Sequence, residues 1–312
     1  METMKQIVLQ EMNEQRYNRK HIDTKIRAAI EGNPGMVAKL NHGVELVKGY
    51  MSKTYSYTTK DGQTKVFESK MRRIAQLENL DVPTMVIDIF VGIAYCLNPE
   101  LFTSVSAQIA ARLKFSDRTE AITTVAELMA VLCLTDAFDI TKADRSASLM
   151  IESKVPLSPQ LVDFIKSSQY LPPMVCEPLE LTHNYSSGYL THNDSLILGS
   201  GNHHDGDICL DVLNTMNQVA LKLDTHFLCT VEEEPTFELD NQEKTDQWNT
   251  FKRQSYEFYD LMVSQGNHFY LTHKVDKRGR IYACGYHINT QGTAFKKASI
   301  ELAHEEIVTG TP

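Results

Sequence analysis

The chain has 312 residues, of which 42% are hydrophobic and 23% charged, and its formal net charge is -9 at pH 7. Such a length allows one large domain or two ordinary ones, and such a composition excludes disordered and fibrous proteins. The negative charge argues against indiscriminate coating of duplex DNA, although one local site for nucleic acid stays compatible with it.

The cysteines and the apolar segments bear on location. Six cysteines stand singly, without a CxxC pair, which favours reduced thiols in a cytoplasm. The N-terminal stretch 1–20 is polar and carries no apolar signal core. The longest apolar run, Met85 to Leu97, is interrupted by Asp88 and is shorter than the roughly 18 residues that a membrane span requires. We therefore expect a cytoplasmic protein without a membrane anchor.

Residues 1–155 are predicted to form a helical N-terminal domain. Their one β signal is the stretch 55–67, in which alternating residues flank Asp61-Gly62. An Asp-Gly pair in this setting is typical of a tight hairpin, because glycine accepts the left-handed backbone conformation of the turn.

Aspartate and proline indicate where helices begin and end in this part of the chain. Asp81 is a capping residue ahead of Pro83, and Pro99 ends the apolar helix that they open. Residues 105–113 are predicted as another helix. Asp117 precedes a third helix, with apolar residues at helical spacing.

The pattern changes after residue 155. Five prolines between 156 and 178, followed by Ser-Ser-Gly and Gly-Ser-Gly, predict an extended connecting segment over 156–210. Apolar residues at helical spacing then predict a long antiparallel helical hairpin over 211–266, with a solvated acidic turn between its two helices.

Alternation with a period of two begins beyond Asn267. Residues 268–275 and 281–288 are predicted strands, and the basic turn Asp276–Arg280 joins them. Residues 295–303 are predicted as a helix. The fold class expected from all segments together is mainly α with a small β part (α+β).

The basic turn carries the strongest chemical signal. From Lys274 to Lys297 there are six Lys or Arg residues and one acid, a net charge of +5, so the rest of the chain carries -14. Guanidinium groups donate paired hydrogen bonds to phosphate oxygens, Gly279 allows a tight turn, and Asp276 can orient a neighbouring arginine. These residues predict phosphate binding by Arg278 and Arg280. The alternative is a solvated hairpin with scattered surface charge.

The stretch NHHDGD, residues 202–207, raises a metal-dependent alternative. His204 with Asp205 is similar to the ligands of metal-dependent phosphohydrolases, but such sites need further imidazole and carboxylate ligands from other helices. The remaining histidines lack ligand spacing. We expect a polar loop here, with a metal phosphohydrolase kept as an alternative.

The segment DKRGRIYACGYHINTQGTAFKKASIELA, Asp276 to Ala303, closely resembles the DxxGR motif and following segment of a known family. This family is the single-subunit RNA polymerases of phages and mitochondria, the T-seven-like family. The matching residues are Asp276, Gly279, Arg280, Tyr282, Gln291, Gly292, Lys297, Leu302 and Ala303.

The resemblance extends upstream. Residues 253–267 and 213–228 are similar to the second and first thumb helices of that family. Residues 172–190 resemble the extended segment before the thumb, and Gly188-Tyr189 stands at the position of the family's Gly-Tyr. The resemblance therefore covers 172–303.

The resemblance implies a DNA-directed RNA polymerase whose thumb and DxxGR turn hold the single-stranded DNA template and the RNA–DNA hybrid. It implies long antiparallel thumb helices over 211–266 and the first palm strands over 267–312. By resemblance and charge, the residues expected at the nucleic acid are Lys252, Arg253, Asp276, Lys277, Arg278, Gly279, Arg280, Tyr282, Gln291, Lys296 and Lys297.

The family's catalytic aspartates, which hold Mg²⁺, lie far downstream of DxxGR, whereas this sequence ends 32 residues after Arg280. We therefore expect no catalytic residue in this chain and no activity from the chain alone. The resemblance is then to the first chain of a split, two-chain N-four-like phage RNA polymerase II. A second chain would carry the aspartates and bind Mg²⁺.

Promoter-reading members of the family have an intercalating hairpin, but here only Glu152 to Gln160 lies at that place. We therefore expect a single-stranded template or a single-strand-binding loading factor as a partner. A phage enzyme would act in the cytoplasm of an infected bacterial cell. The alternative from another class is a non-catalytic single-stranded nucleic-acid-binding or regulatory protein on a degenerate polymerase scaffold.

Overall fold

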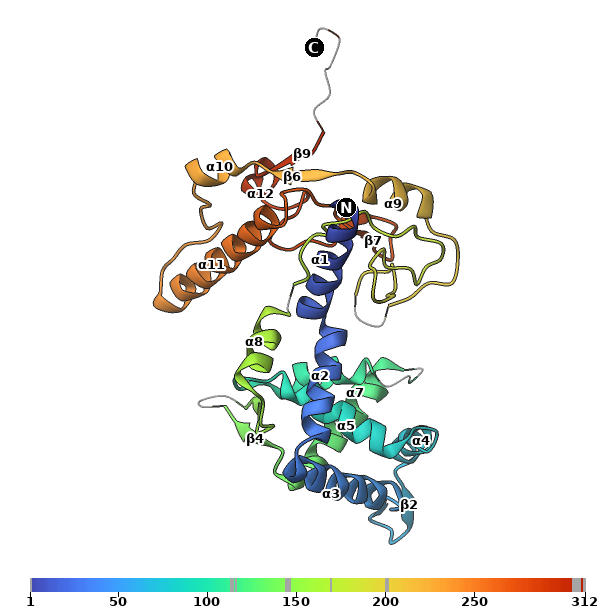
Figure 1. Cartoon of the computed structure of the whole chain (residues 1–312). Helices are drawn as coiled ribbons and strands as arrows, with labels where there is room; N and C mark the ends of the chain where they lie inside the picture. The colour runs from blue at the N-terminus through green and yellow to red at the C-terminus, as the bar shows by residue number, and fades with distance from the viewer. Residues whose placement is uncertain are drawn as a thin grey trace. The chain divides into compact units, whose positions relative to one another are not determined.

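The computed structural model describes residues 2–112, 115, 117–143, 147–168, 170–199, 202–304 and 310, and gives residues 2 and 3 without side chains. The chain is mainly α-helical with a small β part, made of two- and three-stranded antiparallel sheets (Figure 1). It divides into two compact units: Ile22–Lys166, and Met1–His21 together with Ser167–Pro312. In the described part of the chain, no helix has both the length and the apolarity to span a bilayer.

The unit Ile22–Lys166 is built around one apolar helix. From Met85 to Ala94 every residue of α5 except Asp88 is buried, and Asp88 pairs with Arg27. A helix that is apolar on all sides needs neighbours on all sides. Its elements are α2 (Arg19–Glu31), α3 (Pro34–Met51), β1 (Ser56–Thr58), β2 (Thr64–Val66), α4 (Glu68–Leu77), α5 (Val82–Ala94), β3 (Glu100–Leu101), α6 (Phe102–Ala110), α7 (Arg118–Leu132), β4 (Phe138–Lys142), β5 (Leu149–Ser153) and α8 (Pro159–Ser167).

Close contacts between these helices depend on small residues. A Cβ atom on Gly92 of α5 would lie 2.6 Å from Cγ1 of Ile109 of α6, so the glycine allows the two helices to approach. The short strands order as β3-β5-β4. This sheet was not predicted: β4 and β5 form a local hairpin of five-residue strands, and β3 joins it from a distant segment.

Two helix starts and one hairpin were predicted correctly here. The Asp81 side chain accepts a hydrogen bond from the backbone N–H of Thr84, and Asp117 accepts one from Glu120, so both aspartates cap their helices. Strands β1 and β2 pair across the predicted hairpin, and Gly62 has a φ of 77°.

The other unit combines the N-terminal helix with the C-terminal half of the chain. Its core packs Phe258, Tyr259 and Met262 of α11 against Phe269 and Leu271. Its elements are α1 (Glu2–Tyr17), α9 (Leu210–Asn217), β6 (Leu221–Leu223), α10 (Thr225–Thr230), α11 (Gln242–Ser264), β7 (His273–Val275), β8 (Ile281–Ala283), α12 (Ala294–Ala298) and β9 (Ile300–Leu302).

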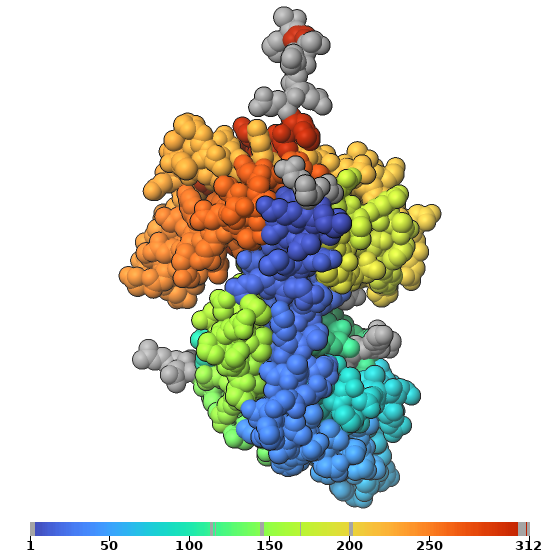
Figure 2. Space-filling model, in the orientation of Figure 1, coloured from blue at the N-terminus to red at the C-terminus, as the bar shows by residue number. Residues whose placement is uncertain are grey.

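Helix α1 is an integral part of this unit. On the face shown in Figure 2, its dark blue surface lies between the orange α11 segment and the yellow-green connecting segment. Gln6 Nε2 donates to the Gln265 backbone oxygen at 3.0 Å, and Glu14 accepts from the Thr191 backbone at 2.8 Å. The predicted domain 1–155 therefore begins and ends at other residues than the compact unit Ile22–Lys166.

The predicted first thumb helix, 213–228, is wrong as a continuous helix. The structure has α9, then β6, then α10 capped by Asp224. The helix is interrupted because the Leu221 backbone exchanges hydrogen bonds with Phe269 at 2.8 and 2.9 Å, and β6 pairs with β9. Only α11 is a long helix in 211–266, so a hairpin of two long antiparallel helices is not formed.

Three further predictions need correction. The connecting segment 156–210 contains a helix, α8, because Leu161 and Ile165 bury one face four residues apart. The predicted strands 268–275 and 281–288 shorten to β7 and β8, and the second ends early because Gly285 lies against the Ile288 carbonyl where the chain turns. The predicted helix 295–303 ends at Ala298, because residues 300–302 pair with β6.

Candidate nucleic-acid interface

The basic turn joins β7 to β8 in a tight hairpin. Lys274 lies opposite Tyr282 and Val275 opposite Ile281 in the register of the two strands. Gly279 has a φ of 79°, the left-handed conformation that glycine adopts without cost, and its N–H donates to the Asp276 carbonyl at 2.9 Å. The turn thus has a defined shape before any ligand binds.

The Asp276 carboxylate organises this turn. Its Oδ1 accepts from the backbone N–H groups of Arg278 and Arg280 at 2.9 and 3.0 Å. Its Oδ2 accepts from Nε and Nη2 of Arg280 at 2.7 and 2.6 Å. The backbone and side-chain hydrogen bonds from Arg280 lower the pKa of Asp276 to about 2, so the carboxylate is ionised at neutral pH.

The Arg280 guanidinium is oriented but accessible. Its side chain is 60% exposed, and its Cζ lies 5.7 Å from the centre of the Tyr282 ring. The hydrogen bond and charge of Asp276 raise the pKa of Arg280. Asp276 engages Nε and Nη2, so among the described residues the other N–H donors of the guanidinium are left for an incoming phosphate.

The other cations of the hairpin are held differently. Lys277 and Arg278 are exposed at the tip. The Lys274 ammonium donates to Asp194 Oδ2 at 2.9 Å, which ties β7 to the connecting segment. The tip therefore presents Lys277, Arg278 and Arg280 to solvent.

Gln291 has a structural position next to β8. Its Oε1 accepts from the Ala283 N–H at 2.9 Å, and its Nε2 donates to the Ile281 carbonyl at 3.0 Å. The amide thus pairs with the backbone of β8 as a neighbouring strand would. The prediction that Gln291 contacts nucleic acid would require it to leave these two bonds.

Lys296, another residue predicted to contact nucleic acid, has a buried side chain. Its ammonium donates to the Tyr286 carbonyl at 2.7 Å and lies 5.0 Å from the Phe251 ring centre. Burial lowers the pKa of Lys296. Lys297, the next residue of α12, is the exposed cation of this pair.

The two predicted cations of α11 lie on its surface. Lys252 is half-buried, with Nζ 5.9 Å from the Trp248 ring centre, and Arg253 faces Glu257 at 4.0 Å. They belong to a separate helix from the hairpin. The structure thus groups Asp276 to Tyr282 in the β7–β8 hairpin and distributes the other predicted residues over α11, the loop after β8 and α12.

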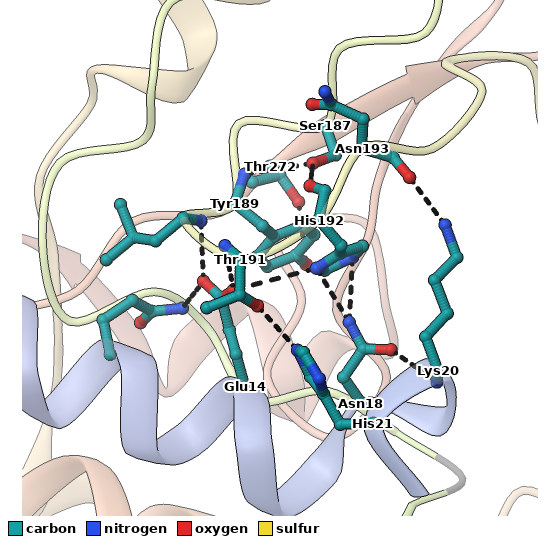
Figure 3. Close-up of polar contacts among 12 residues, drawn as sticks. Glu14, Asn18, Lys20, His21, Ser187, Tyr189, Thr191, His192, Asn193 and Thr272 are labelled. Carbon is teal, nitrogen blue, oxygen red and sulfur yellow. Dashed lines mark hydrogen bonds and ion pairs between the residues drawn. The ribbon is translucent and has the colours of Figure 1, made fainter. Parts of the chain in front are cut away.

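Sequence reasoning missed a buried carboxylate that positions the segment beside this hairpin. Glu14 of α1 has no solvent exposure, and its oxygens accept from the N–H groups of Leu190 and Thr191 at 2.9 and 2.8 Å (Figure 3). Gln10 Nε2 and the Thr191 hydroxyl also donate to it, and a ring nitrogen of His192 lies 3.7 Å away. Each carboxylate oxygen is therefore satisfied, as a buried charge requires.

The pKa of Glu14 is about 2. Burial acts to raise this pKa, but the hydrogen bonds from His192, Thr191, Gln10 and the Leu190 backbone outweigh it. No local signal marked Glu14, because its partners lie far away in the sequence and the buried face of α1 is itself polar.

The same segment reaches the hairpin through Tyr189. The Thr272 hydroxyl lies 3.1 Å from the Tyr189 hydroxyl, directly before β7, and the Tyr189 ring stacks on His192 (Figure 3). Gly188 has a φ of 74°, and a Cβ there would lie 3.3 Å from Pro178. The Gly188-Tyr189 pair thus has a steric reason. Glu14 connects α1 to this loop, and Asp194 connects the loop to Lys274 of β7.

The histidine-rich loop forms local contacts. The Gly206 N–H donates to His204 Nδ1 at 3.0 Å, and Asn184 Nδ2 donates to the Gly206 carbonyl at 2.7 Å. Within the described ranges, no three His, Cys, Asp or Glu side chains lie together as metal ligands.

The chain is similar in sequence to part of a longer known protein. A protein of Gelasinospora sp. (strain G114) named "Probable DNA-directed RNA polymerase" is 29% identical to this chain over 139 residues. The match covers 42% of this chain and 17% of the relative, so the chain corresponds to a small part of that protein's length. No protein-family model matches the chain.

Proposed function

We propose that this chain is part of a DNA-directed RNA polymerase of the single-subunit phage and mitochondrial type. In this proposal the hairpin tip, Asp276 to Arg280, holds the DNA template and the RNA–DNA hybrid. The observation that carries it is the Asp276–Arg280 pairing inside a DxxGR turn, which leaves an oriented, exposed guanidinium. The similarity to a probable DNA-directed RNA polymerase supports the same class.

The charges of the tip suit a phosphate backbone. Asp276 offsets one of three cations, so the tip carries +2 on a chain of net charge -9. An arginine whose Nε and Nη2 are already fixed loses little side-chain freedom when its remaining donors bind phosphate. The hairpin is therefore suited to a local contact with nucleic acid, although the chain as a whole is acidic.

Within the part of the chain that the structure describes, no three His, Cys, Asp or Glu side chains lie together, and the proposal assigns no catalytic step to these residues. We propose that the carboxylates that bind Mg²⁺ come from a second chain, as in a split N-four-like phage enzyme. A single-stranded DNA template, or a single-strand-binding factor that loads it, is the proposed nucleic-acid partner.

The direct test is the binding of a labelled RNA–DNA hybrid and a labelled single DNA strand. If Arg278, Arg280 and Lys297 each neutralise one phosphate, the logarithm of the affinity for the single strand should fall with the logarithm of salt with a slope of about -2, roughly -0.7 per contact. Arg280→Ala should weaken binding and make that slope shallower by about 0.7.

Arg118→Ala is the matched control, because Arg118 is an exposed arginine at the start of α7 in the other unit. Circular dichroism should show the fold intact in both variants. Equal affinity and equal salt slope for Arg280→Ala and the parent chain would remove the hairpin from the proposal. Binding that is lost in Arg280→Ala, with no RNA synthesis in any complex, would instead favour a non-catalytic strand-binding protein.

A further inference from the structure

A second basic segment lies in the unit Ile22–Lys166. Residues 53–73 contain six Lys or Arg residues and two acids, a net charge of +4 in an acidic chain. The segment forms the β1–β2 hairpin and the first turns of α4. This positive charge is therefore concentrated on one hairpin and one helix end.

A groove of about 1090 Å³ runs along this hairpin. Three aromatic residues, Tyr55, Tyr57 and Phe67, line it. Tyr57 and Phe67 are 44% and 49% exposed, and their ring centres are 4.7 Å apart. Two neighbouring rings on a solvent-facing hairpin are apolar surface that folding has left uncovered.

The groove is lined by three cations, Lys65, Lys70 and Arg73. Lys70 and Arg73 pair with Glu127 at 3.0 and 2.7 Å, and the Lys70 ammonium lies 3.8 Å from the Tyr55 ring centre. Lys65, like Lys53 and Lys60 elsewhere in the basic segment, has no acidic partner among the residues that the structure describes. The inner cations thus hold the hairpin side chains in place, and the outer lysines remain available to a ligand.

We propose that this groove binds a single-stranded nucleic acid, with bases stacked on Tyr57 and Phe67 and phosphates near Lys65. Proteins that bind single-stranded nucleic acid combine exposed rings with nearby cations, because an unstacked base covers the ring while its phosphate contacts the cation. A duplex hides its base faces, and an acidic peptide would use the lysines but leave the rings bare. The inference does not depend on the polymerase proposal, because its residues lie in the other unit.

The test uses the full chain carrying Arg278→Ala and Arg280→Ala, so that the β7–β8 hairpin contributes little. Labelled oligothymidine and oligouridine are the probes, read by fluorescence anisotropy. Tyr57→Ala and Phe67→Ala should each weaken binding roughly 5- to 100-fold, the range for loss of one stacked base. Tyr57→Phe should bind as the parent does, because it keeps the ring.

Lys65→Ala should make the salt slope shallower by about 0.7, which a structural role of the lysine would not do. Leu134→Ala and Lys142→Ala are matched controls, since they remove an exposed apolar side chain and an exposed strand lysine outside the groove. Ultraviolet cross-linking followed by mass spectrometry should place the strand on the 55–67 hairpin. The thymidine and uridine probes tell whether DNA or RNA is preferred.

The proposal fails if cross-links avoid the hairpin and both alanine variants bind as tightly as the parent. It also fails if a labelled polyglutamate binds the groove and the oligonucleotides do not, because the groove would then be a surface for acidic proteins. Binding of the RNA–DNA hybrid through Arg280 is measured separately, in the chain that keeps Arg278 and Arg280. Failure of one proposal therefore leaves the other standing.

Discussion

Two carboxylates in the unit of Met1–His21 and Ser167–Pro312 each fix the position of neighbouring groups, one near the surface and one in the interior. Asp276 is near the surface and fixes the Arg280 guanidinium in an exposed position. Glu14 is fully buried and holds the backbone of Leu190 and Thr191. Asp276 and Gly279 could be found from the sequence, because a turn and its charges are local. Glu14 could not, because its partners are distant in the chain.

The same limit separates Lys296 from Lys297. Both are lysines at the end of α12, and only the packing of Phe251 and Tyr286 decides that Lys296 is buried. Gln291 is exposed, and its sequence position does not reveal that two hydrogen bonds hold it to the β8 backbone. Charge alone marked this segment as basic but could not tell which of its lysines reach solvent.

Replacing Glu14 with glutamine tests the buried carboxylate. The variant keeps the shape but removes the charge that accepts the Leu190 and Thr191 N–H groups, so we expect a loss of about 2 kcal/mol of stability at neutral pH. In the parent, the pKa of Glu14 lies at about 2 when folded and near 4.5 ordinarily. Its contribution is therefore present above about pH 4.5 and is lost as the pH falls toward about 2.

Thermal unfolding of both proteins between pH 7 and pH 2 measures this effect. The parent should approach the Glu14→Gln variant in stability as the pH falls, because protonation removes the charge that the variant lacks. Glu11→Gln, on the exposed side of the same helix, is the control and should change little. A Glu14→Gln variant as stable as the parent at pH 7 would contradict this role.

At the scale of elements, local signals located helix starts but not long-range strand pairing. Asp81 and Asp117 cap their helices as predicted, because capping involves residues three positions apart. The helix predicted over 213–228 is interrupted where β6 pairs with β9 and Leu221 bonds to Phe269. Apolar residues at 219–223 fit a helix face and a short strand equally well, so periodicity could not decide.

Gln291→Ala tests the support of the β7–β8 hairpin. Loss of both bonds to the β8 backbone should destabilise the hairpin by about 1–2 kcal/mol. Hydrogen exchange at the Ala283 N–H should become faster, while the buried helices keep their protection. Nucleic-acid binding through Arg280 should weaken moderately, since the turn stands on these strands.

Gln291→Glu separates the two bonds, because a carboxylate still accepts from Ala283 but cannot donate to Ile281. An intermediate exchange rate is expected. Gln108→Ala on the exposed face of α6 is the control. Unchanged exchange at Ala283 in the alanine variant would show that Gln291 does not support the strand.

At the scale of the whole chain, one of the two compact units is built from two separate stretches of the sequence. The largest apolar core lies entirely within Ile22–Lys166, from Ile22 to Ile165. The first helix belongs with the C-terminal half instead. Composition placed the change of pattern near residue 155, but it could not reveal that residues 1–21 pack elsewhere, because that grouping depends on polar contacts such as Asn13 with Gln265.

A fragment of residues 22–166 tests this division. Because its core contacts are internal, we expect it to fold alone, with helical circular dichroism and one cooperative thermal transition. Ile89→Asp inside the fragment should abolish that transition, since the Ile89 side chain is buried and an unpaired charge there is costly. A fragment without a cooperative transition would show that the core depends on the rest of the chain.

The central claim is that this chain works within an RNA polymerase, and purification of the tagged chain from the cells that naturally contain it tests this most directly. Co-purifying chains would be identified by mass spectrometry, and the eluate tested for nucleotide-dependent extension of an RNA primer on single-stranded DNA. We predict a second polypeptide that supplies the magnesium-binding carboxylates, and RNA growth that Arg280→Ala reduces but Arg118→Ala does not. A chain that is recovered alone, binds strands and never extends a primer would contradict the polymerase assignment.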